Sequence, residues 1–121
     1  MVKRILFADD EEDVRIVVSI LLRRAGYIVD LSEDGSFINK VGTDSPPDLY
    51  LLDRRLGAID ALEICFLLKS HPQTKDIPVI MLSADPAVKD LYKNAGADDF
   101  ITKPFDAQFL LDKIALHCRQ R

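Results

Sequence analysis

Polar side chains with the chemistry of a metal and phosphoryl site stand directly after several apolar runs of the chain. Asp9 and Asp10 follow the first run, Asp53 follows a later one, and Ser83 and Lys103 follow two more. Three carboxylates held together repel one another, and a hard divalent cation such as Mg²⁺ relieves that repulsion. A lysine adds a compact positive charge and a serine adds a hydroxyl donor, and both can bind phosphoryl oxygens. Beside these groups a carboxylate can act as a nucleophile toward an activated phosphoryl group.

The run that ends in Asp53 predicts the element that positions this chemistry. Residues 49–52 are Leu-Tyr-Leu-Leu, and Asp53 is followed by Arg54, Arg55 and, two residues on, Gly57. A short apolar run bounded by turn signals is typical of a strand buried on both faces of a sheet. In an open parallel sheet, ligands bind at the edge where the strands end. We therefore expect Asp53 to lie at the carboxyl end of a central strand.

Strand and helix patterns alternate five times along the chain with short connections, which predicts an α/β fold with a five-stranded parallel sheet, right-handed crossovers and helices on both faces. The first helix should end at Gly26 and the third should begin near Asp60. The expected core face of the first helix is Val14, Val17, Val18, Leu21, Leu22 and Ala25, and that of the last is Phe109, Leu110, Leu111 and Ile114. The expected strands are residues 3–8, 27–31, 48–53, 77–82 and 99–102, and the expected helices follow them, with a weak one at 36–41 and others at 60–70, 85–95 and from 106 onward.

Composition indicates one small globular domain that spans residues 1–121. The chain is 48% hydrophobic and 30% charged, with a formal net charge of −4, so no basic footprint for nucleic acid is visible. Cys65 and Cys118 lie far apart without metal-like spacing, as expected for reduced thiols in a cytoplasmic protein. No apolar run is long enough for a signal peptide or a membrane span.

Taken in order, these pieces resemble a response-regulator receiver domain, the phosphoacceptor half of two-component signalling. The resemblance covers residues 3–118. Each piece alone is weak, but together and in order they are specific. The matching residues are Asp9-Asp10, Asp53, Ser83-Ala84, and Gly96-Ala97-Asp98-Asp99-Phe100 leading to Lys103-Pro104-Phe105.

The resemblance implies a flavodoxin-like, doubly wound three-layer sandwich with strand order 2-1-3-4-5 and the first and fifth helices on one face. It implies that Asp53 accepts a phosphoryl group from a sensor histidine kinase or a histidine phosphotransfer protein. Phosphorylation would change the surface of the fourth helix, fifth strand and fifth helix, and so control an output domain or partner protein. A phosphorylation-dependent homodimer is compatible with this scheme.

The resemblance also assigns roles within the site. Asp10 and Asp53 would bind Mg²⁺ with the backbone carbonyl of Arg55, and Asp9 would act largely through water. Ser83 and Lys103 would grip the phosphoryl oxygens. Ser83 would also act as a switch residue, together with Phe100, which stands where the family has an aromatic that turns inward on activation.

Two residues near the expected acceptor depart from the family pattern. Gly57 stands where the family usually has a proline, and Ala61 stands where it usually has a glycine. A glycine is expected to loosen a loop that proline would stiffen. Because the carbonyl of Arg55 is an expected metal ligand, metal affinity depends on how this loop is held.

Other functions use a similar framework. An aspartyl-phosphate phosphatase would carry Asp-x-Asp after the strand, whereas Asp53 is followed by two arginines. A flavin-binding module would have Ser, Thr and Gly in its first loop, where this chain has five consecutive acidic residues, 9–13. A module that binds partners without phosphorylation is a further alternative. Structural roles also compete for single residues: Asp9 and Asp10 could stabilise a helix N-terminus, Ser83 could cap a helix, and Lys103 could be a surface residue.

Three local features carry expectations of their own. The Lys103-Pro104 peptide bond should be cis, because a tight turn would aim Lys103 into the crevice. Arg55 and Asp85 each stand two residues beyond a neighbouring strand end, so we expect an exposed ion pair at the mouth of the pocket. Ile16 and Ile20 lie beside the apolar stripe of the first helix and could form part of a docking patch.

Overall fold

Five parallel strands form the central sheet of the computed structural model, which describes residues 2–43 and 45–119, except for the side chains of residues 88 and 119. The strand order is β2-β1-β3-β6-β7. This is the expected order 2-1-3-4-5, since β4 and β5 form a separate hairpin. The strands are β1 Arg4–Ala8, β2 Ile28–Ser32, β3 Leu49–Asp53, β6 Val79–Ser83 and β7 Asp99–Thr102.

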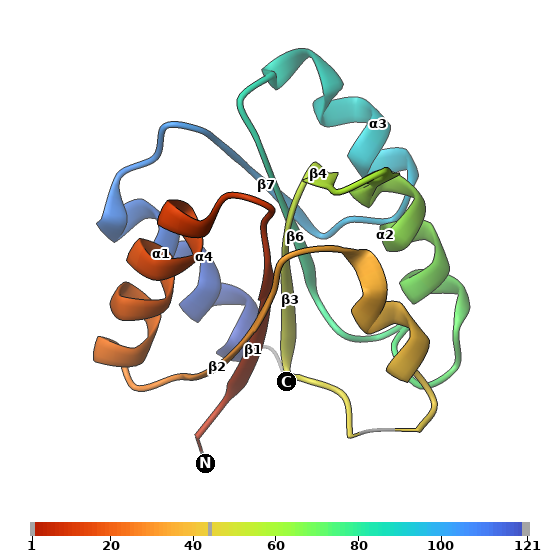
Figure 1. Cartoon of the computed structure of the whole chain (residues 1–121), viewed down its shortest axis with the longest axis horizontal. Helices are drawn as coiled ribbons and strands as arrows, with labels where there is room; N and C mark the ends of the chain where they lie inside the picture. The colour runs from red at the N-terminus through yellow and green to blue at the C-terminus, as the bar shows by residue number, and fades with distance from the viewer. Residues whose placement is uncertain (1, 44, 120–121) are drawn as a thin grey trace.

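Helices cover both faces of the sheet and so give the expected three layers (Figure 1). On one face lie α1 (Glu12–Arg24) and α4 (Ala107–Arg119). On the other face lie α2 (Ala61–Ser70), α3 (Lys89–Asn94) and the 3-10 helix η1 (Gly35–Lys40). A short 3-10 turn, η2 (Pro86–Val88), leads into α3. In the described part of the chain, no helix combines the length and apolar character needed to cross a membrane.

Burial follows the predicted strand pattern. All five residues of β3 and all five of β6 are buried, as expected for central parallel strands covered on both sides. Side chains alternate between the two faces, so each strand contributes to two separate cores. The core beneath α1 and α4 contains Ile5, Phe7, Leu49, Leu51, Ile80, Leu82 and Ile101, and the opposite core contains Tyr50, Leu52, Val79, Met81 and Tyr92.

Three expected core residues, Val17, Ala25 and Phe109, are instead exposed. Val17 on α1 is 56% exposed and Phe109 on α4 is 47% exposed. The buried stripe of α1 contains Val18 and Leu22, one turn apart, because only that narrow face reaches the sheet. The preceding residue on a helix points about 100° away, which turns Val17 toward solvent.

A small antiparallel hairpin after β3 was not expected. It consists of β4 (Arg55–Leu56) and β5 (Ile59–Asp60), joined by Gly57 and Ala58. Gly57 has φ of +69°, a conformation that glycine adopts easily and that proline cannot adopt. The Ala61 N–H donates to the Arg54 carbonyl at 2.9 Å and closes the base of the hairpin. Gly57 therefore closes a hydrogen-bonded hairpin, whereas the sequence had suggested a loosened loop.

Candidate functional site

The register of the sheet brings the predicted site residues to one edge. Ala8 pairs with Leu52, so Asp9 follows β1 beside Asp53. On the other side of β3, Asp53 pairs with Leu82 in β6. The last register pair between β6 and β7 joins Ser83 to Thr102, and the Lys103 N–H donates to the Ser83 carbonyl at 2.8 Å.

Asp53 is a nearly enclosed carboxylate at the end of β3, with 6% of its surface exposed. Its Oδ1 lies 2.5 Å from the ammonium nitrogen of Lys103, and its Oδ2 accepts the Arg55 N–H at 3.2 Å. Burial raises the pKa of Asp53, and the negative charge of Asp9 adds to this, while Lys103 acts in the opposite direction. The carboxylate is thus held in place but incompletely stabilised in its charged form.

Lys103 bridges Asp53 and Asp9. Its Nζ lies 3.0 Å from Oδ2 of Asp9, which is fully buried. The other oxygen of Asp9 accepts the Glu11 N–H at 2.9 Å. Burial alone would lower the pKa of Lys103, but the hydrogen bonds and charges of Asp53 and Asp9 outweigh it, and the pKa is raised. Lys103 therefore stays protonated between the two acids.

Asp9, Asp10 and Asp53 together form a group able to hold a metal ion. Each offers a carboxylate oxygen, and these oxygens all lie within 4.8 Å of one another. Asp10 is exposed, so the group opens to solvent on that side. Three carboxylates face one ammonium here, and oxygen donors with excess negative charge suit Mg²⁺. The chemistry of the donor set therefore fits the expected metal.

The hairpin leaves the backbone carbonyl of Arg55 outside its own ladder. Arg54 accepts from Ala61, so Arg54 and Ala61 form a hydrogen-bonded pair. Hydrogen-bonded and non-hydrogen-bonded pairs alternate in an antiparallel ladder. Arg55 pairs with Asp60 in the next, non-hydrogen-bonded position, so its carbonyl accepts no hydrogen bond from the facing strand. The Arg55 carbonyl is therefore compatible with a role as metal ligand.

Ser83 lies at the end of β6 and is also buried. Its Oγ accepts the Asp85 N–H at 3.1 Å, so the side chain does cap the following turn. It also lines a cavity of about 330 Å³ whose wall contains Asp53 and Lys103, and further wall residues are Glu11, Arg54, Arg55, Ala84 and Asp85. The capping role and a role toward a ligand are compatible, because a serine hydroxyl has one proton and two lone pairs.

Phe100, the expected switch residue, is half-buried in β7. Its ring packs against Tyr92 of α3, with ring centroids 5.5 Å apart. Tyr92 itself is fully buried. The expected aromatic position is therefore in contact with a second aromatic side chain that sequence reasoning did not single out.

The prediction of an ion pair between Arg55 and Asp85 is wrong, because the two side chains do not pair. Asp85 accepts the Ala87 N–H at 3.0 Å and caps η2. The neighbouring arginine, Arg54, pairs with Asp60 at 3.6 Å across the base of the hairpin. Local capping thus takes Asp85 away from the position that strand spacing alone suggests. The Lys103-Pro104 peptide is cis, as predicted.

Sequence reasoning missed three residues near the site. Glu11 and Arg54 line the cavity, and Tyr92 is buried in the adjoining core against Phe100. For Glu11 the acidic run 9–13 was a signal, but nothing in that run distinguishes the residue that faces the cavity. Tyr92 falls on the apolar face of a short helix three residues before Ala95, where the pattern predicts only a core role.

Comparison with known proteins agrees with this arrangement. The family model described as "Response regulator receiver domain" matches residues 5–115. The chain belongs to the receiver domain family. This receiver domain is 38% identical over 113 residues to the DNA-binding dual master transcriptional regulator RpaA of Synechocystis, covering 92% of the chain and 47% of that protein. The chain thus spans about half the length of the curated relatives it matches.

Solved structures show the same fold. A putative response regulator from Chloroflexus aurantiacus superposes with a TM-score of 0.92 at 30% identity, covering 98% of the receiver domain and 99% of that chain. The chemotaxis response regulator CheY4 of Vibrio cholerae gives a TM-score of 0.88 at 27% identity, covering 96% and 98%. The five-stranded, doubly wound architecture predicted from the sequence is therefore confirmed.

Proposed function

We propose that residues 1–121 act as one phosphoacceptor domain, a signalling switch in which Asp53 receives the phosphoryl group. The observation that carries this is the environment of Asp53. It is a buried carboxylate that faces a cavity, contacts the ammonium group of Lys103 and neighbours two further acids. A buried carboxylate with only a structural role would be expected to have enough basic partners to neutralise its charge.

The transfer uses a carboxylate oxygen of Asp53 as nucleophile. The oxygen forms a bond to phosphorus while the bond between phosphorus and the imidazole nitrogen of a phosphohistidine breaks. The imidazole leaves with the electron pair and takes up a proton. Lys103, which pairs with Asp53 before the reaction, then has a phosphoryl oxygen within its reach, and Ser83 can donate its hydroxyl proton to another. The solvent supplies the proton that the imidazole takes up, so atoms and charge balance.

Asp10, Asp53 and the Arg55 carbonyl would hold Mg²⁺ directly, and Asp9 would act through water. When bound, this ion supplies positive charge that neutralises the acids and the transferred phosphoryl group. Asp9 is suited to the indirect role because both of its oxygens already accept hydrogen bonds, from Glu11 and Lys103. Asp10, in contrast, is exposed at the open side of the group.

The phosphodonor would be a sensor histidine kinase or a histidine phosphotransfer protein. The domain would catalyse its own phosphotransfer and dephosphorylation and would not turn over a separate substrate. Its output would pass through Ser83 and Phe100 to the surface formed by α3, β7 and α4, and from there to an output domain, a partner protein or a second copy of the chain.

With a net charge of −4, the domain itself would not bind nucleic acid. Cys65 and Cys118 are both buried, as expected for reduced thiols at a cytoplasmic site of action.

The test is incubation with acetyl phosphate, with and without Mg²⁺, followed by intact-mass measurement. The parent protein should gain one phosphoryl group only when Mg²⁺ or Mn²⁺ is present. Asp53→Asn should remain folded and unlabelled, while the matched variant Asp99→Asn, at another partly buried aspartate, should be labelled like the parent. Labelling that persists in Asp53→Asn would overturn the assignment.

A further inference from the structure

Tyr92 is a fully buried tyrosine whose ring contacts that of Phe100, the expected switch residue. It comes from α3, none of its surface is exposed, and it belongs to the core that includes Met81. Its ring is tilted by 30° against that of Phe100. Its phenol therefore points into the protein on the side of the sheet that α2 and α3 cover.

The hydroxyl of Tyr92 is an enclosed donor without a protein partner. Among the described residues it is the one buried side-chain polar atom that makes no hydrogen bond. Burial raises the pKa of the phenol, and the charges of Asp60 and Asp53 add to this, while Arg54 and the hydroxyl of Ser83 act against it. Ser83 lies two residues beyond Met81 on β6, so its side chain projects from the same face of the sheet as Met81, toward the core that contains Tyr92. No hydrogen bond joins the two hydroxyls in this state.

Ser83 has one unused lone pair in this state. Among the described residues, its Oγ accepts one hydrogen bond, from the Asp85 N–H at 3.1 Å. A hydroxyl oxygen can accept two hydrogen bonds and donate one. If the Ser83 proton turns to a phosphoryl oxygen on Asp53, the oxygen of Ser83 becomes a better acceptor for a second donor.

We propose that Tyr92 is a positioning residue for Ser83, whose Oγ accepts the Tyr92 O–H once Ser83 donates its own proton to the phosphoryl group. This proposal rests on the proposed function of Asp53 as phosphoacceptor. It adds a relay from the phosphoryl oxygen through Ser83 to Tyr92, and so to α3 and to the ring of Phe100. The expected switch pair Ser83 and Phe100 thereby gains a third member that contacts Phe100 and lies near Ser83.

The orphan hydroxyl gives this relay its driving force. An enclosed donor without a partner raises the free energy of the unphosphorylated state, and a partner gained on phosphorylation removes that penalty. A group that is better satisfied in one of two states shifts the equilibrium toward that state. Tyr92 should therefore favour the phosphorylated conformation, and its hydroxyl should do so only through Ser83.

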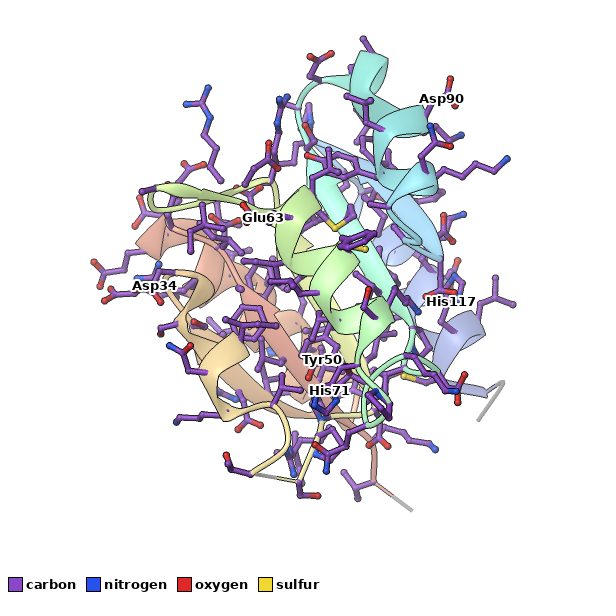
Figure 2. All side chains as sticks on the ribbon, turned by 90° about the vertical axis from the view of Figure 1, so that its right-hand side faces the viewer. Asp34, Tyr50, Glu63, His71, Asp90 and His117 are labelled. Carbon is purple, nitrogen blue, oxygen red and sulfur yellow. The ribbon has the colours of Figure 1, made fainter. Side chains whose placement is uncertain are left out.

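The test measures binding of beryllofluoride, a phosphoryl mimic, at saturating Mg²⁺ by titration calorimetry. Tyr92→Phe, which removes only the hydroxyl, should weaken binding about two- to tenfold, the range of one hydrogen bond. In a Ser83→Ala background, Tyr92→Phe should have no further effect. The matched control is Tyr50→Phe. Tyr50 is also buried, but it lies in the lower half of the molecule, away from Asp90 on α3 at the top (Figure 2), and its loss should leave the affinity unchanged.

Two further outcomes decide the proposal. The melting temperature of unliganded Tyr92→Phe should equal or exceed that of the parent, since an unsatisfied group has been removed. Equal beryllofluoride affinity in Tyr92→Phe and the parent would overturn the proposal. So would a loss of affinity on Tyr92→Phe that is the same in the parent and in the Ser83→Ala background. If the parent is phosphorylated at Asp53 in these cases, the proposed function stands and only the relay is wrong. A parent that neither binds beryllofluoride nor becomes phosphorylated would overturn both.

Discussion

Two aspartates of this receiver domain show opposite electrostatics. Asp53, at the end of β3, shares the single ammonium of Lys103 with Asp9, and burial raises its pKa. Asp99, at the start of β7, lies 3.1 Å from Lys113 and 2.8 Å from His117. Burial acts to raise the pKa of Asp99 too, but hydrogen bonds from His117, the Phe100 N–H and Lys113 outweigh it, and its pKa is lowered.

The difference lies in how completely each carboxylate is neutralised by the protein itself. The Asp99 cluster contains one acid and two basic side chains, so it is complete without a ligand. The Asp53 cluster contains three acids and one lysine, so it keeps negative charge that a cation can neutralise. Burial alone therefore does not distinguish a structural carboxylate from a functional one, whereas the local charge balance does.

Removing the lysine of each cluster should give the largest contrast. Lys103→Met leaves Asp9 and Asp53 buried without a cation and should lower the free energy of unfolding by about 3 kcal/mol in metal-free buffer. Lys113→Met leaves Asp99 with His117 and a backbone N–H, and should cost less than about 1 kcal/mol. Urea titration measures both. Added Mg²⁺ should restore part of the lost stability in Lys103→Met and none in Lys113→Met. Equal losses of stability in the two variants would contradict the proposed difference between the Asp53 and Asp99 clusters.

Neutralising the aspartates should change stability in opposite directions. Asp53→Asn should raise the free energy of unfolding at pH 7 without metal by about 1 kcal/mol. The substitution relieves repulsion between the carboxylates, while Lys103 still forms its ion pair with Asp9. Asp99→Asn should lower it by about 1 kcal/mol, because charged hydrogen bonds are lost. Metal-free denaturation curves give both values. A destabilised Asp53→Asn would show that Asp53 is already satisfied.

The pH dependence gives a smaller but more specific contrast. The pKa of Asp99 is lowered on folding. Ionised Asp99 therefore adds to the free energy of unfolding at pH values above its ordinary pKa, and this contribution is lost as the pH falls through its pKa in the folded protein. The stability difference between the parent and Asp99→Asn should therefore shrink toward zero as the pH approaches 2. For Asp53, whose pKa is raised, ionisation above the ordinary value costs stability, so Asp53→Asn should lose its advantage in acid. Acid-range urea titrations that show the same slope for both variants would contradict the opposite shifts.

The sequence predicted the sheet well because buried parallel strands leave a strong pattern. The runs that end in Asp53 and Ser83 are almost wholly apolar, and each stops at a polar residue where the strand ends. Parallel strands place such residues at one edge, so the cluster followed from strand order alone. The structure brings together Asp9, Asp10, Asp53, Ser83 and Lys103 as expected.

Other features depended on geometry that sequence pattern does not contain. A hairpin of two-residue strands has no periodicity to detect, so β4 and β5 were missed although Gly57 stood between them. Val17 shows that apolar spacing does not fix the width of the buried stripe on a helix. Asp85 shows that a nearby backbone N–H can compete with an arginine for a carboxylate. Among the described residues, none forms a hydrogen bond with the Tyr92 hydroxyl, which only side-chain coordinates reveal.

The most direct test of the charge-balance account is a ¹³C carboxyl titration by NMR that follows Asp53 and Asp99 in the same sample. In metal-free buffer the pKa of Asp53 should lie above the ordinary aspartate value of 3.8 and that of Asp99 below it. Added Mg²⁺ should lower the pKa of Asp53 and leave that of Asp99 unchanged. An Asp53 pKa at or below that of Asp99, or one that does not respond to Mg²⁺, would contradict the account.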